Sequence, residues 1–224
     1  MSEQGGRVRL DVALQYCHAV ERAGGVPVIL APMISMLDEY AARCDGFLLT
    51  GGGDPRTEPF GVATHSRVTP QHQIRQEFET MLLARLDGEK TTPVLGVCLG
   101  MQMMCLVAGG TLNQRMEDSV PTHAEHWNSE HRVAPIGSPR RFELSGLVHS
   151  RHRQAVTGAG TLVPIASSPD GILEAVVDES KEFYLGVQWH PERTPDAAVG
   201  QRLFDQFIAA ATGSSSGRRV PRGS

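Results

Sequence analysis

The chain has 224 residues, with 21 Lys or Arg against 25 Asp or Glu, which gives a formal net charge of −4 at pH 7. This mild acidic balance argues against a broad electrostatic surface for nucleic acid or anionic membrane. Hydrophobic residues make up 40% of the chain, enough for a sizeable core, and the four cysteines lack the spacing of a disulfide scaffold. We therefore expect a cytoplasmic protein that binds neither nucleic acid nor membrane.

The two ends of the chain add little to the fold. Residues 1–6 lack the basic-then-apolar order of a signal peptide, and the most apolar stretch, residues 94–110, is too short and too interrupted by glycine to span a bilayer. Residues 213–224 are rich in Ser, Gly and Arg, and their end resembles the remnant of an expression tag. We expect one domain over residues 1–212 and a tag remnant over 213–224.

Helical and strand patterns alternate along the first half of the chain. Apolar spacing predicts helices over residues 11–23, 71–86 and 99–107, with Asp11 as the first N-cap and Gly24 as its stop. Short apolar runs predict strands over 26–30, 47–49 and 94–97, and later strands over 132–136, 161–165, 173–177 and 183–189 precede a helix over 195–211. Strands separated by helices favour a parallel sheet with helices on both faces.

Cys98 lies on the expected sharp turn between a strand ending at Val97 and a helix beginning at Leu99. Gly96 and Gly100 remove side chains where strand and helix crowd, as in a nucleophile elbow, with sulfur in place of a hydroxyl. A helix N-terminus also favours the thiolate. The alternative is a buried structural cysteine, which is our interpretation of Cys17, Cys44 and Cys105.

A base for such a thiolate is available near the end of the chain. His190 and Glu192 are two residues apart, so an extended segment would project both side chains to one side. A carboxylate beside an imidazole fixes its tautomer and supports its charged form. Alone, the segment could equally be a surface turn; together with Cys98 it indicates a nucleophile and its base.

Three glycines, residues 51–53, follow the apolar run that ends at Leu49. Their amides can face a ligand without steric hindrance, and one of them could join the Leu99 amide in binding the oxyanion of an acyl intermediate. A phosphate-binding loop is the rival interpretation, but the Lys-Ser/Thr of a P-loop is absent. A plain turn also remains open.

A metal site is the weaker interpretation of the histidines at 123, 126 and 131, which are followed by His149 and His152. A His-x-x-His pair in a loop-like stretch is a poor signal without a matched Cys or carboxylate, although Glu125 and Glu130 are near in sequence. We expect no metal here, and place His131 near the site entrance or against the sheet.

Taken together, these segments resemble the class I (triad) glutamine amidotransferase family. The shared motifs are Gly51-Gly-Gly-Asp-Pro, Gly96-Val-Cys-Leu-Gly-Met-Gln and Gly186-Val-Gln-Trp-His-Pro-Glu. Within it, His149-Ser-Arg-His-Arg-Gln and Ser168-Pro-Asp-Gly-Ile-Leu-Glu-Ala are similar to the γ-glutamyl hydrolase-type branch, and the resemblance runs from about Leu10 to Ala210.

The resemblance implies a doubly wound α/β fold with a mostly parallel sheet flanked by helices and a small antiparallel excursion in the C-terminal half. It implies hydrolysis of a γ-glutamyl amide through a thioester, with no metal or organic cofactor. The implied roles are nucleophile, base and orienting carboxylate for Cys98, His190 and Glu192; oxyanion amides for Gly51 or Gly52 and Leu99; and substrate contacts for Gln102 and His152.

Two departures qualify this resemblance. The family usually opens with an apolar strand, whereas only Gly6-Arg-Val-Arg-Leu precedes Asp11, so that strand is missing or very short. In the His152 loop, His149 and Arg153 replace the usual Asn and Gly, so Arg151 and Arg153 either meet a substrate carboxylate or are simply solvated.

Three functions stay open on this scaffold. We favour a stand-alone hydrolase of a small γ-glutamyl substrate over a glutaminase that delivers ammonia to a synthetase partner. A non-catalytic binding protein is disfavoured because all three triad residues are present. The sequence does not decide between a monomer and a homodimer.

Overall fold

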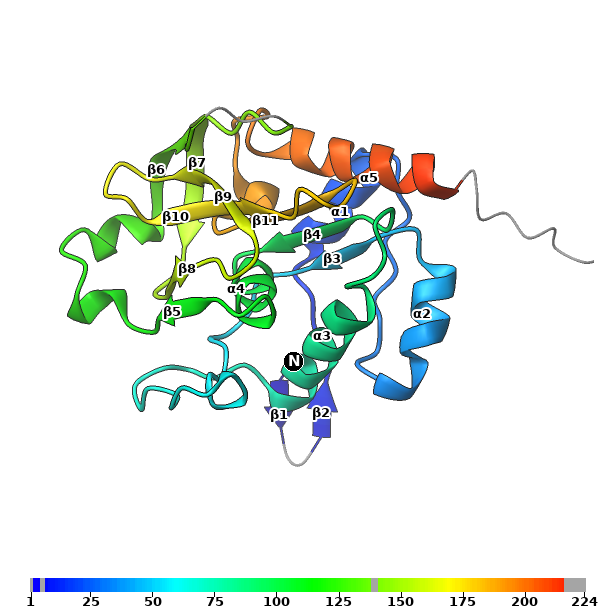
Figure 1. Ribbon diagram of the computed structural model, residues 1–224, viewed down its shortest axis with the longest axis horizontal. Coiled ribbons are helices and arrows are strands. Elements are labelled where there is room, and N and C mark those ends of the chain that lie inside the picture. Colours follow the sequence, from blue (N-terminus) through cyan, green and yellow to red (C-terminus); the bar gives the residue numbers. More distant parts are fainter. Residues whose placement is uncertain (1, 5–6, 138–140, 216–224) are drawn as a thin grey trace, which may run out of the picture.

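The computed structural model describes residues 2–4, 7–137 and 141–215, and it arranges helices on both faces of a seven-stranded sheet (Figure 1). Helix α5 extends to Ser215, so it includes the first three residues of the predicted tag remnant, while residues 216–224 lie outside the described residues. In the described part of the chain, every helix is too short or too polar to cross a membrane.

The main sheet has the order β3-β4-β11-β10-β9-β6-β7. Strand β4 pairs in parallel with β3 and β11, and antiparallel pairing continues from β11 to β7. The α/β fold is therefore confirmed, with the antiparallel part formed by the C-terminal half. The strands are β3 (Phe47–Leu49), β4 (Val94–Val97), β6 (Trp127–Pro135), β7 (Gly146–Arg151), β9 (Val163–Ser167), β10 (Leu173–Val177) and β11 (Tyr184–Val187).

Two cores cover the two faces of this sheet. Helices α1 (Leu14–Arg22) and α5 (Gln201–Ser215) contact each other on one face, while α2 (Leu37–Arg43), α3 (Gln73–Arg85) and α4 (Leu99–Val107) lie on the other (Figure 1). Strand β4 alternates between them, since Leu95 and Val97 belong to the α1–α5 core and Val94 to the α3–α4 core. This central strand leads into the turn at Cys98.

The remaining elements are short. Two two-stranded antiparallel sheets pair β1 (Ser2–Gln4) with β2 (Arg7–Arg9) and β5 (Thr111–Asn113) with β8 (Ala155–Gly158). Single 3-10 turns are η1 (Ile34–Met36), η2 (Glu58–Phe60), η3 (Met116–Asp118), η4 (His123–His126) and η5 (Pro191–Arg193). Among these turns, η4 carries the buried His126, and η5 carries the buried Glu192.

Two predicted helix starts were wrong. Helix α1 begins at Leu14 after an N-cap at Ala13 that makes no side-chain cap bond, so Asp11 does not cap it. The last helix begins at Gln201 rather than Pro195, because an Asp196 carboxylate accepts from the Ala198 amide and holds a turn there. Gly24, with φ of +86°, does follow the end of α1 as predicted.

The strand predicted over residues 26–30 is absent, and this marks the open edge of the sheet. Strand β3 is the last strand at this edge and β2 pairs with β1, so the described residues supply no strand between β3 and residues 26–30. Without such a partner, Val26, Val28 and Ile29 are 87%, 69% and 61% exposed. In the part of the chain that the structure describes, residues 26–30 have no paired strand, which accounts for the failed strand prediction.

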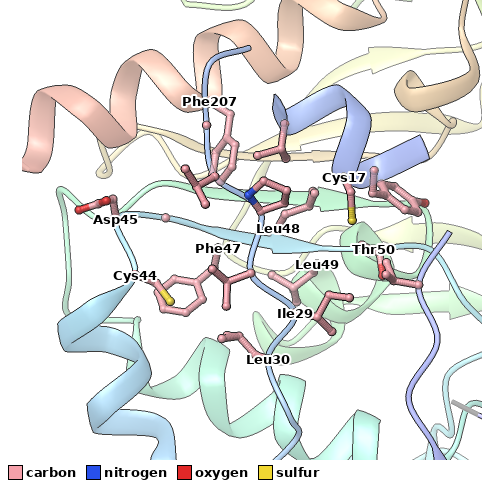
Figure 2. A pocket seen from close by; sticks show the side chains of 18 of the residues that line it. Cys17, Ile29, Leu30, Cys44, Asp45, Phe47, Leu48, Leu49, Thr50 and Phe207 are labelled. Carbon is pink, nitrogen blue, oxygen red and sulfur yellow. The ribbon is translucent and has the colours of Figure 1, made fainter. Parts of the chain in front are cut away.

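A cavity of about 460 Å³ lies along this edge, between α1, β3, α5 and residues 26–32. Figure 2 shows Phe47 and Leu49 of β3, Phe207 of α5 and Ile29 of the unpaired segment around it. Tyr16 also lines the cavity and contacts His190, so it separates this space from the region of Cys98.

Side-chain truncations on the two sides of this cavity should lower the free energy of unfolding by different amounts. Leu49→Ala is expected to lower the free energy of unfolding by about 2–4 kcal/mol, because Leu49 is 3% exposed and packs in the core. Ile29→Ala should change it by less than about 1 kcal/mol, because Ile29 is largely exposed. Urea denaturation of both variants checks this, and equal losses would place residues 26–30 in the sheet after all.

Candidate active site

Cys98 occupies a strained turn at the end of β4. Its φ of 53° and ψ of −103° are rare for a residue with a side chain, and cost about 1–3 kcal/mol. The surroundings hold this conformation: the Cys98 amide donates to Val187 at 2.8 Å, and the Cys98 carbonyl accepts from Gln102 at 3.1 Å. At Gly100 a Cβ would collide with the backbone of Leu49, which is the crowding predicted for this turn. The strand-turn-helix expected around Cys98 is therefore present.

His190 and Glu192 meet immediately after β11. The two residues lie at η5, a 3-10 turn rather than the extended segment we expected, yet His190 Nδ1 and Glu192 Oε1 are 2.7 Å apart. Burial alone would lower the pKa of His190, but hydrogen bonds and charge attraction from Cys98 and Glu192 outweigh it and raise the pKa to about 10. His190 is thus held between the Glu192 carboxylate and the Cys98 sulfur, in surroundings that favour its imidazolium form.

The glycine loop approaches this pair closely. A Cβ on Gly51 would lie 2.9 Å from His190 Cε1 and 2.9 Å from the Tyr16 hydroxyl, so only glycine fits there without displacing a ring. A Cβ on Gly52 would instead meet the Leu99 side chain at 2.7 Å, which places Gly52 beside the first residue of α4. The structure therefore brings Gly51, Gly52 and Leu99 to the edge of the Cys98 site.

Arg75 fixes the loop from behind. Its guanidinium donates to the carbonyls of Gly51 (3.2 Å) and Thr50 (2.5 Å), and its Nε donates to the nearly buried Glu79 carboxylate at 2.7 Å. Burial raises the pKa of Glu79, and the charge of Arg75 opposes that rise. With the two carbonyls turned toward Arg75, the loop amides are held in one orientation.

Tyr16 on α1 belongs to the same site, although sequence analysis missed it. Its hydroxyl accepts from the Gly51 amide at 3.0 Å and lies 3.4 Å from His190 Nδ1. Burial, and next the charge of Glu192, raise the pKa of Tyr16, so the hydroxyl keeps its proton at physiological pH. The apolar spacing of α1 gives no signal for this role, because Tyr16 sits on the helix face that packs against the core.

Two buried glutamines lie under the sulfur. Gln188 Nε2 donates to Cys98 Sγ at 3.7 Å, and Gln188 Oε1 accepts from Gln102 Nε2 at 3.3 Å. Gln102 also donates to the Gln154 carbonyl at 3.3 Å. Gln102 therefore reaches Cys98 through Gln188, while Gln188 itself carried no role in the sequence interpretation.

His152 and the two arginines of its loop are placed away from Cys98. The His152 ring contacts the Gln154 carbonyl (2.8 Å) and His126 (3.2 Å), and its role as a substrate contact stays a prediction. Arg153 and Arg151 stack on Trp127, with guanidinium carbons 3.8 and 5.3 Å from the ring centroid. The Arg151 carbonyl touches the site, where it accepts from Cys98 Sγ at 3.9 Å.

The residues of this site fall within a region shared with a known protein family. The sequence profile of the peptidase C26 family matches residues 4–192, a range that includes the glycine loop, Cys98, His190 and Glu192. The chain belongs to the peptidase C26 family. This confirms the resemblance to class I glutamine amidotransferase-like proteins of the γ-glutamyl hydrolase type.

Relatives of this peptidase C26 protein have two kinds of name. It is 28% identical over 221 residues to the γ-glutamyl-γ-aminobutyrate hydrolase PuuD of Escherichia coli, covering 88% of this chain and 84% of the relative. It is 31% identical over 212 residues to a Mycobacterium tuberculosis protein assigned as a glutamine amidotransferase, covering 88% and 67%. The family and these names place the chain among enzymes of the hydrolase and glutamine amidotransferase kind.

A solved structure supports the fold alone. A Thermoplasma acidophilum protein assigned as one of the GMP synthase chains matches this peptidase C26 protein with a TM-score of 0.66 at 15% identity, over 90% of this chain and 89% of its own. The overall fold is therefore shared with that protein.

The close approach of Gly51 leads to a testable expectation. Gly51→Ala should slow alkylation of Cys98 by iodoacetamide about 10-fold or more, because the new methyl displaces His190 from the sulfur. Gly88→Ala is the matched control, since a Cβ at Gly88 meets no atom within 4 Å. Peptide mapping after timed labelling measures both, and equal rates would show that Gly51 does not position His190.

Proposed function

We propose that the chain is a cysteine hydrolase that cleaves a γ-glutamyl amide bond through a γ-glutamyl thioester on Cys98, releasing glutamate and an amine. The observation that carries this is the geometry around His190: one ring nitrogen held at 2.7 Å by Glu192, and the ring interacting with a sulfur on a strained elbow. This is the arrangement of a nucleophile, a base and an orienting carboxylate.

In the first half-reaction the Cys98 thiolate attacks the side-chain carbonyl carbon of the γ-glutamyl group. The carbonyl oxygen becomes an oxyanion, which the Leu99 amide at the start of α4 can bind. The Gly51 amide already donates to Tyr16, which favours the adjacent Gly52 amide as the second donor. The C–N bond then breaks, and the leaving amine takes a proton from the His190 imidazolium.

In the second half-reaction water attacks the thioester. His190, now neutral, takes the proton of that water, the C–S bond breaks, and glutamate leaves with Cys98 restored as thiolate. Glu192 stabilises the imidazolium in both halves through its bond to Nδ1. Gln188 donates to the sulfur, and Gln102 holds Gln188, so these two act as positioning residues in this scheme. No step needs a metal or an organic cofactor.

Release of glutamate from a panel of substrates tests the proposal. The panel holds γ-glutamyl-γ-aminobutyrate, other γ-glutamyl amines and glutamine, each offered to wild type and to Cys98→Ser. Release from a γ-glutamyl amine by the chain alone, lost in Cys98→Ser, is the expected result. If glutamine is the one substrate hydrolysed, and its hydrolysis requires an added synthetase, the ammonia-delivering alternative is favoured. If no substrate releases glutamate and Cys98 is unreactive, a binding protein is favoured.

A further inference from the structure

A second group of polar side chains is buried in the antiparallel half of the sheet, apart from the Cys98–His190–Glu192 site. It comprises His126 at the end of η4, His131 on β6, His152 just after β7 and Glu174 on β10. Their exposed fractions are 1%, 7%, 3% and 0%. One ligand-type atom from each lies within 4.8 Å of all the others. The fold thus brings three imidazoles and one carboxylate together at one buried position, which we call the His₃Glu cluster.

The spacing within the His₃Glu cluster matches that of ligands around one metal ion. Glu174 Oε1 lies 3.4 Å from His126 Nδ1, 3.3 Å from His131 Nε2 and 3.7 Å from His152 Nε2. His126 Nδ1 and His152 Nε2 are 3.2 Å apart. Tetrahedral ligands at the usual Zn–N and Zn–O distances of about 2.0–2.1 Å stand roughly 3.3 Å from one another. Four of the six distances are close to this value and the whole set lies within 4.8 Å, so the four atoms could share one ion after His131 moves inward.

In each imidazole ring the nitrogen that points away from Glu174, here called the outward nitrogen, has a hydrogen-bond partner that fixes the tautomer. His126 Nε2 lies 3.0 Å from the Asp170 carboxylate, His152 Nδ1 lies 2.8 Å from the Gln154 carbonyl, and His131 Nδ1 lies 3.1 Å from the Arg132 carbonyl. A carbonyl and a carboxylate can only accept, so in each neutral ring the proton is on the outward nitrogen. Each imidazole then turns a lone pair inward, as a metal ligand supported from behind does.

The inward side of the His₃Glu cluster contains polar atoms without hydrogen bonds. Both Glu174 oxygens and His131 Nε2 are buried without a hydrogen-bond partner. A fully buried carboxylate facing three nitrogen lone pairs is costly unless a cation sits among them. Either protons on the imidazoles or a metal ion would supply that cation.

We propose that His126, His131, His152 and Glu174 bind one divalent transition-metal ion, and that this ion is Zn²⁺. Three imidazoles and a carboxylate form a set of borderline ligands that suits zinc, and the count of four closes the coordination as in a structural site. This proposal departs from the expectation of no metal. Of the histidines considered from the sequence it keeps His126 and His131, whereas His123 contacts the Val120 carbonyl and stays outside the His₃Glu cluster.

The site would act on Cys98 through the backbone. His152 follows Arg151, whose carbonyl accepts from Cys98 Sγ. The Gln154 carbonyl accepts from both His152 Nδ1 and Gln102 Nε2. An ion on His152 would hold residues 151–154 in place beside the sulfur, so we assign it a positioning role rather than a catalytic one. The metal site itself does not depend on the proposed hydrolysis.

Metal content of the full chain tests the proposal. Elemental analysis of protein stripped with a chelator, reloaded with Zn²⁺ and dialysed should find one Zn²⁺ per chain. Reloading with Co²⁺ should give the intense visible absorption of a tetrahedral N/O site. Glu174→Gln and His131→Ala should lose this stoichiometric binding, whereas His123→Ala, altered three residues from His126, should keep it. Asp170→Asn, which alters the contact on the outward side of His126 and leaves the four ligands in place, should weaken binding about 10–100-fold.

Two results would overturn the proposal. One is a wild-type chain that holds no stoichiometric Zn²⁺ or Co²⁺ after dialysis and melts at the same temperature with and without chelator; protons would then neutralise the cluster. The other is equal binding by wild type and Glu174→Gln, which would mean surface binding only. If the ligand variants fail to fold, the wild-type Co²⁺ spectrum and the Asp170→Asn affinity still decide.

Discussion

Cys98→Ser is expected to lower kcat/KM for γ-glutamyl amide hydrolysis by at least about 10³-fold, because a serine hydroxyl at this position is not ionised by a histidine the way a thiol is. Steady-state release of glutamate measures the change. Cys17→Ser is the matched control: Cys17 is a free, partly exposed thiol on α1 and has no role in the proposed reaction. Its activity should stay within about twofold of wild type.

The order of thiol labelling gives the same prediction a second readout. Cys98 is 6% exposed, while Cys17 and Cys44 are more accessible, so access alone would label those two first. Burial and the charge of Asp45 raise the pKa of Cys44, and burial raises the pKa of Cys105 to about 12, so both react slowly as thiols. We expect Cys98 to alkylate fastest. Even labelling of all four cysteines, with activity kept in Cys98→Ser, would contradict the role of Cys98.

Glu192→Gln is the second variant with a large expected effect, and its signature is a change in pH dependence. The pKa of about 10 for His190 keeps the imidazolium until the pH approaches 10, and the alkaline limb of the activity profile falls as this acid is lost. Removing the carboxylate charge lowers the pKa of His190, so the limb should move to lower pH. The kcat should fall by about 10²–10⁴-fold, because the tautomer is no longer fixed.

The same raised pKa predicts a contribution to stability. A group whose folded pKa of about 10 exceeds its unfolded value of 6.5 stabilises the fold fully below pH 6.5 and loses that contribution as the pH rises through 10. The stability advantage of wild type over Glu192→Gln should therefore shrink between these limits. Glu179→Gln, an equal charge change in the exposed turn between β10 and β11, is the control. A Glu192→Gln profile that matches this control would remove Glu192 from the site.

The parts of the fold that local pattern specifies were predictable. Strands β3, β4 and β10 and helices α3 and α4 came from apolar runs and helical spacing that the buried faces require. The strand predicted over residues 26–30 has a similar composition but does not form, because a strand also needs a partner and the described part of the chain places none beside it. Amino-acid propensity identifies a possible strand, but the strand forms only where the fold provides a partner strand.

The residues of the candidate site likewise fall into two groups, those that a local sequence pattern predicts and those that only the folded structure reveals. Cys98, His190 and Glu192 lie in short segments whose chemistry is visible in one window, and the structure brings them together. Tyr16 and Gln188 look like ordinary core and strand residues until the fold sets them against Gly51 and the sulfur. The His₃Glu cluster draws on residues from 126 to 174, so no local spacing could reveal it.

Trapping the acyl-enzyme tests the role of Cys98 as nucleophile most directly. Wild type mixed with a γ-glutamyl amide and quenched in acid during the first turnovers should gain the mass of one γ-glutamyl group, located by peptide mapping on Cys98 and released by hydroxylamine as a thioester is. Cys98→Ser should gain nothing. Glutamate release without any adduct on Cys98, or with the adduct on another cysteine, would contradict that role.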